Sequence, residues 1–212
     1  MSTDYSKVIT FDGTSGSGKG TIAKIIADHY GYKYLDTGKL YRALALLILI
    51  HSKQGDYLQD LGFLIGKINQ ELLSKKDLYT EDVTNLSSKI AANPEVRKSL
   101  LSFQRNFANS TGGAVLDGRD TGSIICPEAE NKFYIDADLT IRSKRRYLQN
   151  KEFYDKVNMG VSDIEKSLFA RDKQDKEREI APLIVPDGAH VIDNSKDDLE
   201  TVIKNIKYII DY

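Results

Sequence analysis

The sequence has few of the residues from which disulfide frameworks and zinc sites are built. Its 212 residues include one cysteine, Cys126, and three histidines, His29, His51 and His190. A single cysteine rules out an intramolecular disulfide, and no histidine has another cysteine or histidine nearby at metal-ligand spacing. We therefore expect a reducing compartment and no structural zinc site, with each histidine at the surface or partly packed.

Charge of one sign and long apolar runs are also scarce. The formal net charge is -1, so no global basic field indicates a nucleic-acid partner. The longest apolar run, Ala43 to Ile50, is far shorter than the roughly 18 residues of a membrane span. The polar N-terminal residues do not resemble a signal peptide. We expect one cytoplasmic domain over residues 1–212 that acts as a monomer, without a nucleic-acid or membrane partner.

The stretch Val8 to Thr21, VITFDGTSGSGKGT, combines a short apolar strand, a glycine-rich loop and a lysine that opens a helical pattern. Glycines let backbone N–H groups converge on an anion, and the start of a helix adds partial positive charge. This order is that of a phosphate-binding loop, the P-loop, and it predicts a nucleoside triphosphate site. Its candidate contacts are Gly13, Thr14, Ser15, Gly16, Ser17, Gly18, Lys19, Gly20 and Thr21.

The loop departs from the general motif directly after its lysine. The general motif places a serine or threonine there as a magnesium ligand, whereas this chain has Gly20 and carries the hydroxyl at Thr21. The pattern GxxGxGKGT is more similar to the loop of nucleoside monophosphate kinases than to that of GTPases or motor ATPases. We expect Thr21 to contribute to a Mg2+ site.

Short apolar runs alternate with helical patterns along the chain. Strands are expected at 8–11, 32–35, 114–116, 132–135 and 189–192. Helices are expected at 20–30, with His29 in its buried stripe, at 39–51, buried on most sides, and at 86–92, 94–108, 140–149, 161–176 and 199–210. The polar range 53–85 shows no single element that persists, and 151–160 is also polar. The alternation predicts an α/β fold with a five-stranded parallel sheet flanked by helices.

Every expected strand ends in an aspartate, at the sheet edge where such folds bind ligands. These residues are Asp12, Asp36, Asp117, Asp136 and Asp193. Asp117 ends a hydrophobic run in the manner of a Walker B strand, so we expect it at the magnesium site. Arg119 and Asp120 follow it, and we favour a functional role for them over simple pairing with each other.

Two further charged segments are ambiguous when taken alone. In DTGKLYR, Thr37 and Arg42 can bind phosphate at a helix start, or the segment can hold an N-cap, Asp36 or Thr37, and a solvated arginine. Arg171, Asp175 and Arg178 share one helix face, which by itself favours a solvated, salt-bridged helix. The basic run Arg142, Lys144, Arg145 and Arg146 is likewise more often a solvated face, and Arg145 is our candidate within it for an ATP contact.

Taken together, these stretches resemble the bacterial cytidylate kinase family over most of the chain. The matching segments are ITFDGTSGSGKGT, LDTGKLYRALAL, IAANPEVRKSLLSFQRNFA, LDGRDTGS, FYIDAD and ARDKQDKEREIAPL. Many kinases share the P-loop, whereas the set DTGxxYR, LDGRD and RDxxDxxR is far more specific. The resemblance implies a P-loop kinase fold with a monophosphate-binding insert near 53–85 and a short lid near 149–171.

The resemblance also implies roles for individual residues. The acceptor phosphate would be held by Thr37, Arg42 and Arg119. The cytosine would be read by Ser88, Arg97 and Asp120, with Ser87 as the alternative to Ser88. The ribose and the transferring phosphates would meet Arg171, Asp175 and Arg178.

Phosphoryl transfer needs alignment and cations more than covalent chemistry. The candidate catalytic cations are Lys19, Arg119, Arg171 and Arg178. We therefore predict an enzyme that uses ATP and Mg2+ to phosphorylate CMP or dCMP. The alternatives are a kinase of UMP or of a small metabolite, and a nucleotide-binding switch without transfer activity.

Overall fold

The computed structural model describes residues 5–51, 57–110 and 112–212, which fall into two compact units. The sheet unit comprises the chain up to Leu35 and from Ala108 onward, and the helical unit comprises Asp36–Phe107. The range 53–85, our predicted insert, falls within the helical unit, and residues 53–56 lie outside the described residues.

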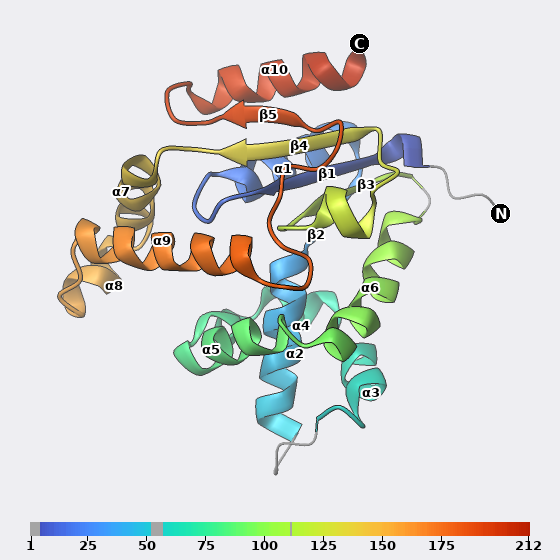
Figure 1. The fold of residues 1–212 in the computed structure, drawn as a ribbon, viewed down its shortest axis with the longest axis vertical. Coiled ribbons are helices and arrows are strands. Elements are labelled where there is room, and N and C mark those ends of the chain that lie inside the picture. Colours follow the sequence, from blue (N-terminus) through green and yellow to red (C-terminus); the bar gives the residue numbers. More distant parts are fainter. Residues whose placement is uncertain (1–4, 52–56, 111) are drawn as a thin grey trace. The chain divides into compact units, whose positions relative to one another are not determined.

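Five strands form the sheet, in the order β2-β3-β1-β4-β5 (Figure 1). They are β1 (Val8–Gly13), β2 (Lys33–Asp36), β3 (Ala114–Asp117), β4 (Asn131–Asp136) and β5 (His190–Asp193). β1 pairs in parallel with β3 and β4, and β4 pairs in parallel with β5. The predicted α/β fold is confirmed, and each strand ends at or next to its predicted aspartate.

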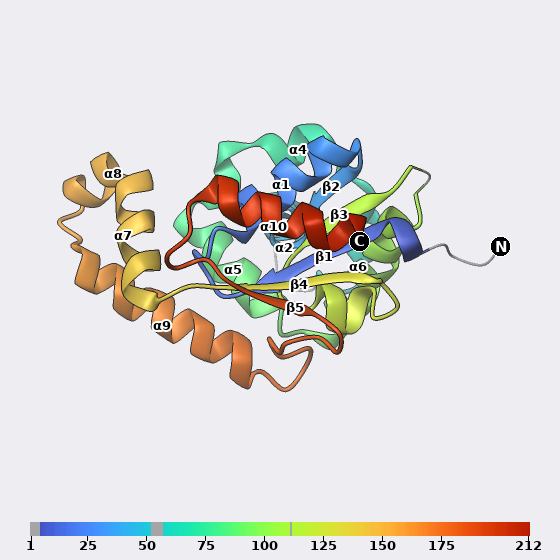
Figure 2. The same ribbon diagram turned by 90° about the horizontal axis from the view of Figure 1, so that it is seen from above.

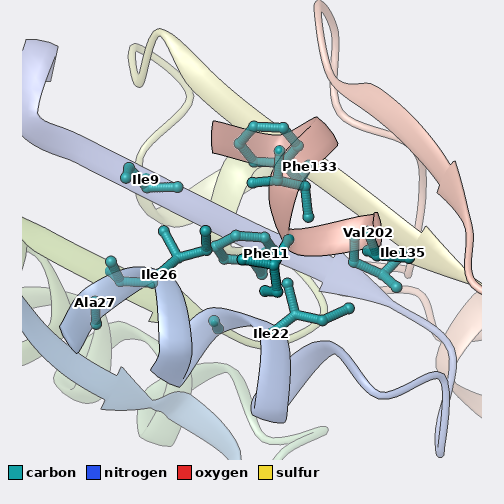
Figure 3. Close-up of a cluster of buried hydrophobic side chains, with 12 residues drawn as sticks. Ile9, Phe11, Ile22, Ile26, Ala27, Phe133, Ile135 and Val202 are labelled. Carbon is teal, nitrogen blue, oxygen red and sulfur yellow. The ribbon is translucent and has the colours of Figure 1, made fainter. Parts of the chain in front are cut away.

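The core of the sheet unit lies between the central strands and the helices α1 (Lys19–Tyr30) and α10 (Leu199–Asp211). Phe11 on β1 stacks on Phe133 of β4 with ring centroids 5.2 Å apart. Figure 3 shows Ile22 and Ile26 of α1 pointing toward Phe11. His29, expected in the buried stripe, is exposed, because it lies in the last turn beside the exposed cap residue Gly31. Burial of this apolar cluster fixes α1, and with it the P-loop, on the sheet.

Three helices between β4 and β5 form a cluster of their own (Figure 2). They are α7 (Leu139–Gln149), α8 (Lys151–Lys156) and α9 (Val161–Glu177), and we call them the α7–α9 segment. Tyr154, Ile164 and Leu168 are buried there, and Tyr154 stacks on Tyr147 at 6.2 Å. The range 151–160, expected only to be polar, contains the short helix α8, in which Tyr154 is buried.

The helical unit contains short helices where none were expected. Its elements are α2 (Thr37–His51), α3 (Leu61–Gly66), α4 (Gln70–Ser74), η2 (Lys76–Tyr79), α5 (Glu81–Ile90) and α6 (Pro94–Ala108). The range 53–85, in which no single element was expected to persist, holds the short elements α3, α4 and η2, each of which buries at least one leucine. α5 also begins before the predicted 86. At the end of α2, Leu49 and Ile50 are exposed, so this helix is less buried than expected.

No helix among the described residues combines the length and the apolar character needed to cross a bilayer.

Candidate active site

The P-loop runs from Gly13 to Gly18, between β1 and α1. Gly16 and Gly18 adopt positive φ angles of 78° and 89°, which residues with a Cβ rarely adopt. A Cβ at Gly13 would lie 1.9 Å from the backbone oxygen of Ile135. The loop opens directly onto the N-terminus of α1, whose first residue is Lys19. The structure therefore places backbone N–H groups and one ammonium together, as anion binding requires.

Gly20 accommodates the carboxylate of Asp117, which ends β3. A Cβ at Gly20 would lie 2.9 Å from Asp117 Oδ2. The Tyr34 hydroxyl donates to the same oxygen at 3.2 Å, and Lys19 Nζ lies 3.7 Å from Asp117 Oδ1. A side chain at position 20 would therefore require the Asp117 carboxylate to move. The hydroxyl of Thr21 follows on an exposed position of α1.

Side chains from β4, from α9 and from the residue directly after β5 form hydrogen bonds with the P-loop. The Thr14 hydroxyl donates to Asp136 of β4 at 2.6 Å, and the Asn194 amide donates to the Ser17 carbonyl at 2.6 Å. Asp172 of α9 accepts the Ser15 N–H. The sequence predicts Asp136 at the ligand-binding edge of the sheet without a specific role, and it assigns no role to Asn194 or Asp172. Asn194 could have been found, because it directly follows a strand end, whereas Asp172 stands in a charged helix without any distinguishing signal.

The turn that follows β3, Gly118–Gly122, carries a cluster of opposite charges. Arg119 Nε donates to Asp175 Oδ2 at 2.8 Å. Arg178 Nη2 lies 3.8 Å from Asp120 Oδ1, and its Nη1 lies 4.0 Å from Asp175 Oδ1. Burial alone would lower the pKa of Arg119, but the Asp175 carboxylate, with help from Asp117 and Asp172, raises it above its ordinary value. The guanidinium therefore stays charged.

These contacts correct the sequence reading of α9. The helix ends at Glu177, so Arg178 lies just beyond it in an extended conformation and not on the helix face. Arg171, Asp175 and Arg178 are partly buried, and two of them pair with the turn after β3. Asp175 and Arg178 therefore do not lie on a solvated helix face. The alternative that placed them there is wrong for these two residues.

The basic run on α7 is also less solvated than expected. Arg142 is buried, and its Nε donates to the Ala137 carbonyl at 2.7 Å. Arg145 is partly buried and donates to the Asn194 carbonyl at 2.8 Å, so the candidate ATP contact lies beside a residue that holds the P-loop. Lys144 alone matches the solvated interpretation, because Arg146 is partly buried and donates to the Tyr154 hydroxyl.

A buried carboxylate joins the turn after β3 to the strand that precedes the P-loop. Asp12 Oδ1 accepts from the N–H and the hydroxyl of Thr121 at 2.8 and 2.9 Å, and Oδ2 accepts from the Gly122 N–H at 2.8 Å. Burial raises the pKa of Asp12 from 3.8 to about 6, against the opposing effect of these hydrogen bonds. Asp12 thereby anchors the first turn of η3 (Thr121–Ile125) to β1.

The helical unit holds the other predicted residues in hydrogen bonds of its own. Thr37 is the first residue of α2, and Asp36 Oδ1 accepts the Lys39 N–H at 3.1 Å in the manner of an N-cap. Arg42 Nη1 donates to the Leu78 carbonyl at 3.0 Å and to the Thr84 hydroxyl at 2.7 Å. Its guanidinium lies 5.2 Å from the Tyr79 ring centroid, so Arg42 is not a solvated arginine.

The two candidate serines of α5 differ in exposure. The hydroxyls of Ser87 and Ser88 both donate to the Thr84 carbonyl, at 2.9 and 3.1 Å, but Ser87 is buried and Ser88 is exposed. Arg97 of α6 donates to the Ala91 carbonyl at 3.0 Å and lies 5.7 Å from the Tyr41 ring centroid. Ser88 is therefore the serine of this pair that solvent reaches.

Known proteins resemble the chain over nearly its whole length. A sequence model described as cytidylate kinase matches residues 9–211. A cytidylate kinase of Rhodopseudomonas palustris (strain BisB18) is 41% identical over 203 residues, which cover 93% of this chain and 92% of that protein. One from Afipia carboxidovorans is 40% identical, covering 96% and 97%. A crystal structure of an uncharacterized protein from Eubacterium ventriosum shares the fold, with a TM-score of 0.55 at 17% identity over 96% of this chain and 97% of that chain. The sequence matches extend over the segments that form both units.

Proposed function

Because this chain belongs to the cytidylate kinase family, we propose that it transfers the γ-phosphate of ATP to CMP or dCMP and releases CDP or dCDP. The observation that carries the proposal is the family match over residues 9–211. It is supported by a P-loop whose Lys19 lies beside the strand-end carboxylate of Asp117. Its substrates are small molecules, and we further propose that it acts as a monomer in the cytoplasm.

The donor nucleotide is assigned to the P-loop, with Arg145 as an additional contact. The Lys19 ammonium and backbone N–H groups between Gly13 and Thr21, other than that of Ser15, which donates to Asp172, bind the triphosphate. Asp117 and Thr21 offer a carboxylate and a hydroxyl, which are oxygen ligands of the kind that Mg2+ prefers. These residues therefore fit the ion, and when bound it supplies positive charge between the donor phosphates.

The cations assigned to the transfer step are Arg119, Arg171 and Arg178, together with Lys19. They stabilise the charge on the transferring phosphoryl group, whose transition state spreads it over three oxygens. The acceptor phosphate is already an anionic nucleophile, so no general base is assigned. Asp175 is assigned to the ribose, and it also orients Arg119 through the 2.8 Å hydrogen bond.

The remaining assignments concern recognition of the acceptor. Thr37 and Arg42, in the helical unit, are proposed to bind the phosphate of CMP together with Arg119. Ser88, Arg97 and Asp120 are proposed to read the cytosine. Ser88 is preferred over Ser87 because its hydroxyl is exposed on α5.

The test is a coupled assay of ADP release with ATP, Mg2+ and a panel of nucleoside monophosphates. CMP and dCMP should turn over, and substitution of Arg97 by alanine should raise the KM for CMP while the KM for ATP stays unchanged. Turnover of UMP or another monophosphate at a normal rate, without CDP formed from CMP, would contradict the proposal. ATP binding without acceptor-dependent ADP release would indicate a nucleotide switch instead.

A further inference from the structure

One buried ion pair encloses a single residue of the P-loop, Ser15. Arg142 Nη1 on α7 lies 2.6 Å from Asp172 Oδ2 on α9. Asp172 Oδ1 accepts the Ser15 N–H at 2.9 Å, and Arg142 Nη1 donates to the Ser15 carbonyl at 2.8 Å. The three residues are between 4% and 6% exposed. Both polar groups of the Ser15 backbone are therefore bound by the same pair of side chains.

The geometry of the peptide bond extends this contact to the next residue. In a trans peptide the carbonyl of one residue and the N–H of the next point in opposite directions, and the described residues contain no cis peptide bond. Holding the Ser15 carbonyl on Arg142 therefore turns the Gly16 N–H away from Arg142. The Ser17 carbonyl is held in the same manner by Asn194, which fixes the direction of the Gly18 N–H.

We propose that Arg142 and Asp172 are positioning residues for the donor nucleotide. They fix the Ser15 peptide so that the P-loop presents the Gly16 N–H, and not a carbonyl oxygen, to the triphosphate. This inference rests on the proposed ATP site. Because the pair lies on α7 and α9, the shape of the loop depends on the packing of the α7–α9 segment, whose cluster includes Leu168, one turn before Asp172.

Two other roles for the pair predict different results. If Asp172 acted only through its negative charge, its removal would favour the binding of an anion to the nearby loop, and the KM for ATP would fall. If the pair only stabilised the fold, its loss would lower the stability or the folded fraction, while the KM of the folded enzyme for ATP would not change. A positioning role predicts a higher KM for ATP.

The first variant is Asp172→Asn, which nearly preserves the size of the side chain. Its amide replaces one oxygen by a donor, and that donor must face either Arg142 or the Ser15 N–H, both of which are donors themselves. One contact is lost in either orientation. We expect the KM for ATP to rise roughly tenfold, as for the loss of a charged hydrogen bond, with kcat at saturating ATP within about twofold of the wild type.

The second variant is the double substitution Arg142→Met/Asp172→Leu. Buried ion pairs can often be replaced by apolar residues of similar size without loss of stability, so this variant removes both contacts to Ser15 and leaves no unpaired charge. It should also show weaker ATP affinity in its folded fraction. A thermal melt measures that fraction, because the Ala137 carbonyl and the Ser15 backbone groups lose their side-chain partners and some stability with them. The matched control is Asp187→Asn, at an exposed position of the loop before β5, which should leave the KM for ATP unchanged.

The affinity for a non-hydrolysable ATP analogue, measured by calorimetry without CMP, provides a readout that does not depend on the acceptor. An unchanged or tighter affinity in the folded Asp172→Asn variant, with the wild-type KM for ATP, would overturn the inference. Failure of the wild type to phosphorylate CMP would contradict the proposed function instead, and it would leave this binding comparison intact.

Discussion

The turns after the neighbouring strands β1 and β3 offer different chemical groups to a charged ligand. The P-loop after β1 is rich in glycine, and other segments of the sheet unit fix its position. The hydrogen bond from Thr14 to Asp136 is one such contact. The turn after β3 instead presents charged side chains, with Arg119 bound to Asp175 at 2.8 Å. One turn offers backbone N–H groups, whereas the other offers guanidinium and carboxylate groups.

The difference predicts which substitutions each turn tolerates. The P-loop depends on backbone conformation and on the space beside its glycines, so an added methyl group should harm it. The turn after β3 depends on the guanidinium of Arg119. That group binds the Asp175 carboxylate and would also bind a substrate phosphate. Loss of a side chain should therefore harm the β3 turn most.

The largest effect is expected for Arg119→Ala. It removes a partly buried guanidinium from the β3 turn, and arginines that stabilise the transferring phosphoryl group are worth ~10³ in rate or more. We expect kcat/KM for CMP phosphorylation to fall by that factor in the coupled assay. The matched control is Arg105→Ala, at an exposed position of α6, which should leave the rate unchanged. A loss of less than tenfold in Arg119→Ala would contradict the role assigned to the β3 turn.

The next effect concerns Asp12, which joins the two turns. The pKa of Asp12 in the folded protein, about 6, exceeds its ordinary value of 3.8. Between these values the native state binds more protons than the unfolded state, so stability from Asp12 is fully present below pH 3.8 and is lost as the pH rises through 6. The rise of about 2 pKa units corresponds to about 3 kcal/mol of unfolding free energy.

The measurement is urea unfolding of the wild type and of Asp12→Asn between pH 4 and pH 7. Asparagine does not titrate, so the free energy of unfolding of the wild type should fall relative to the variant across this range. A difference that stays constant with pH would show that Asp12 is not titrating from a raised pKa. It would also contradict the burial of an ionisable carboxylate at the contact between β1 and the turn after β3.

The sheet and the P-loop were predicted from the sequence because their signals are local. Apolar runs ending in aspartate gave five strands, and the glycine spacing with Lys19 gave the loop. The helices α3 and α4 were missed, since they are too short to show a helical period and bury only two leucines and one leucine, respectively. Periodicity requires several turns, and tertiary contacts determine shorter helices.

The supporting side chains of the site could not be predicted from the sequence. Arg142 and Asp172 stand 30 residues apart in runs of similar charges, and nothing in those runs distinguishes the buried member from its solvated neighbours. The same holds for Arg178, whose approach to Asp120 requires the chain to leave the helix after Glu177. Residue type alone does not show burial, because long charged side chains are found both buried in pairs and solvated.

The smallest change in stability, but a clear change in rate, is expected for Gly20→Ala in the P-loop helix. Alanine in a helix is favoured over glycine by up to about 1 kcal/mol. Against this, the new Cβ would lie 2.9 Å from Asp117 Oδ2, and crowding of this kind costs about 1–3 kcal/mol. The two effects oppose each other, so the free energy of unfolding should change little. The rate should still fall about tenfold, because the Asp117 carboxylate must shift relative to Lys19, and a small misplacement at a reacting centre is costly.

The control is Gly62→Ala in α3, where a Cβ would meet nothing within 4 Å, so stability should rise and the rate should not change. If Gly20→Ala kept the wild-type rate, the close approach of Asp117 to position 20 would not matter for the rate.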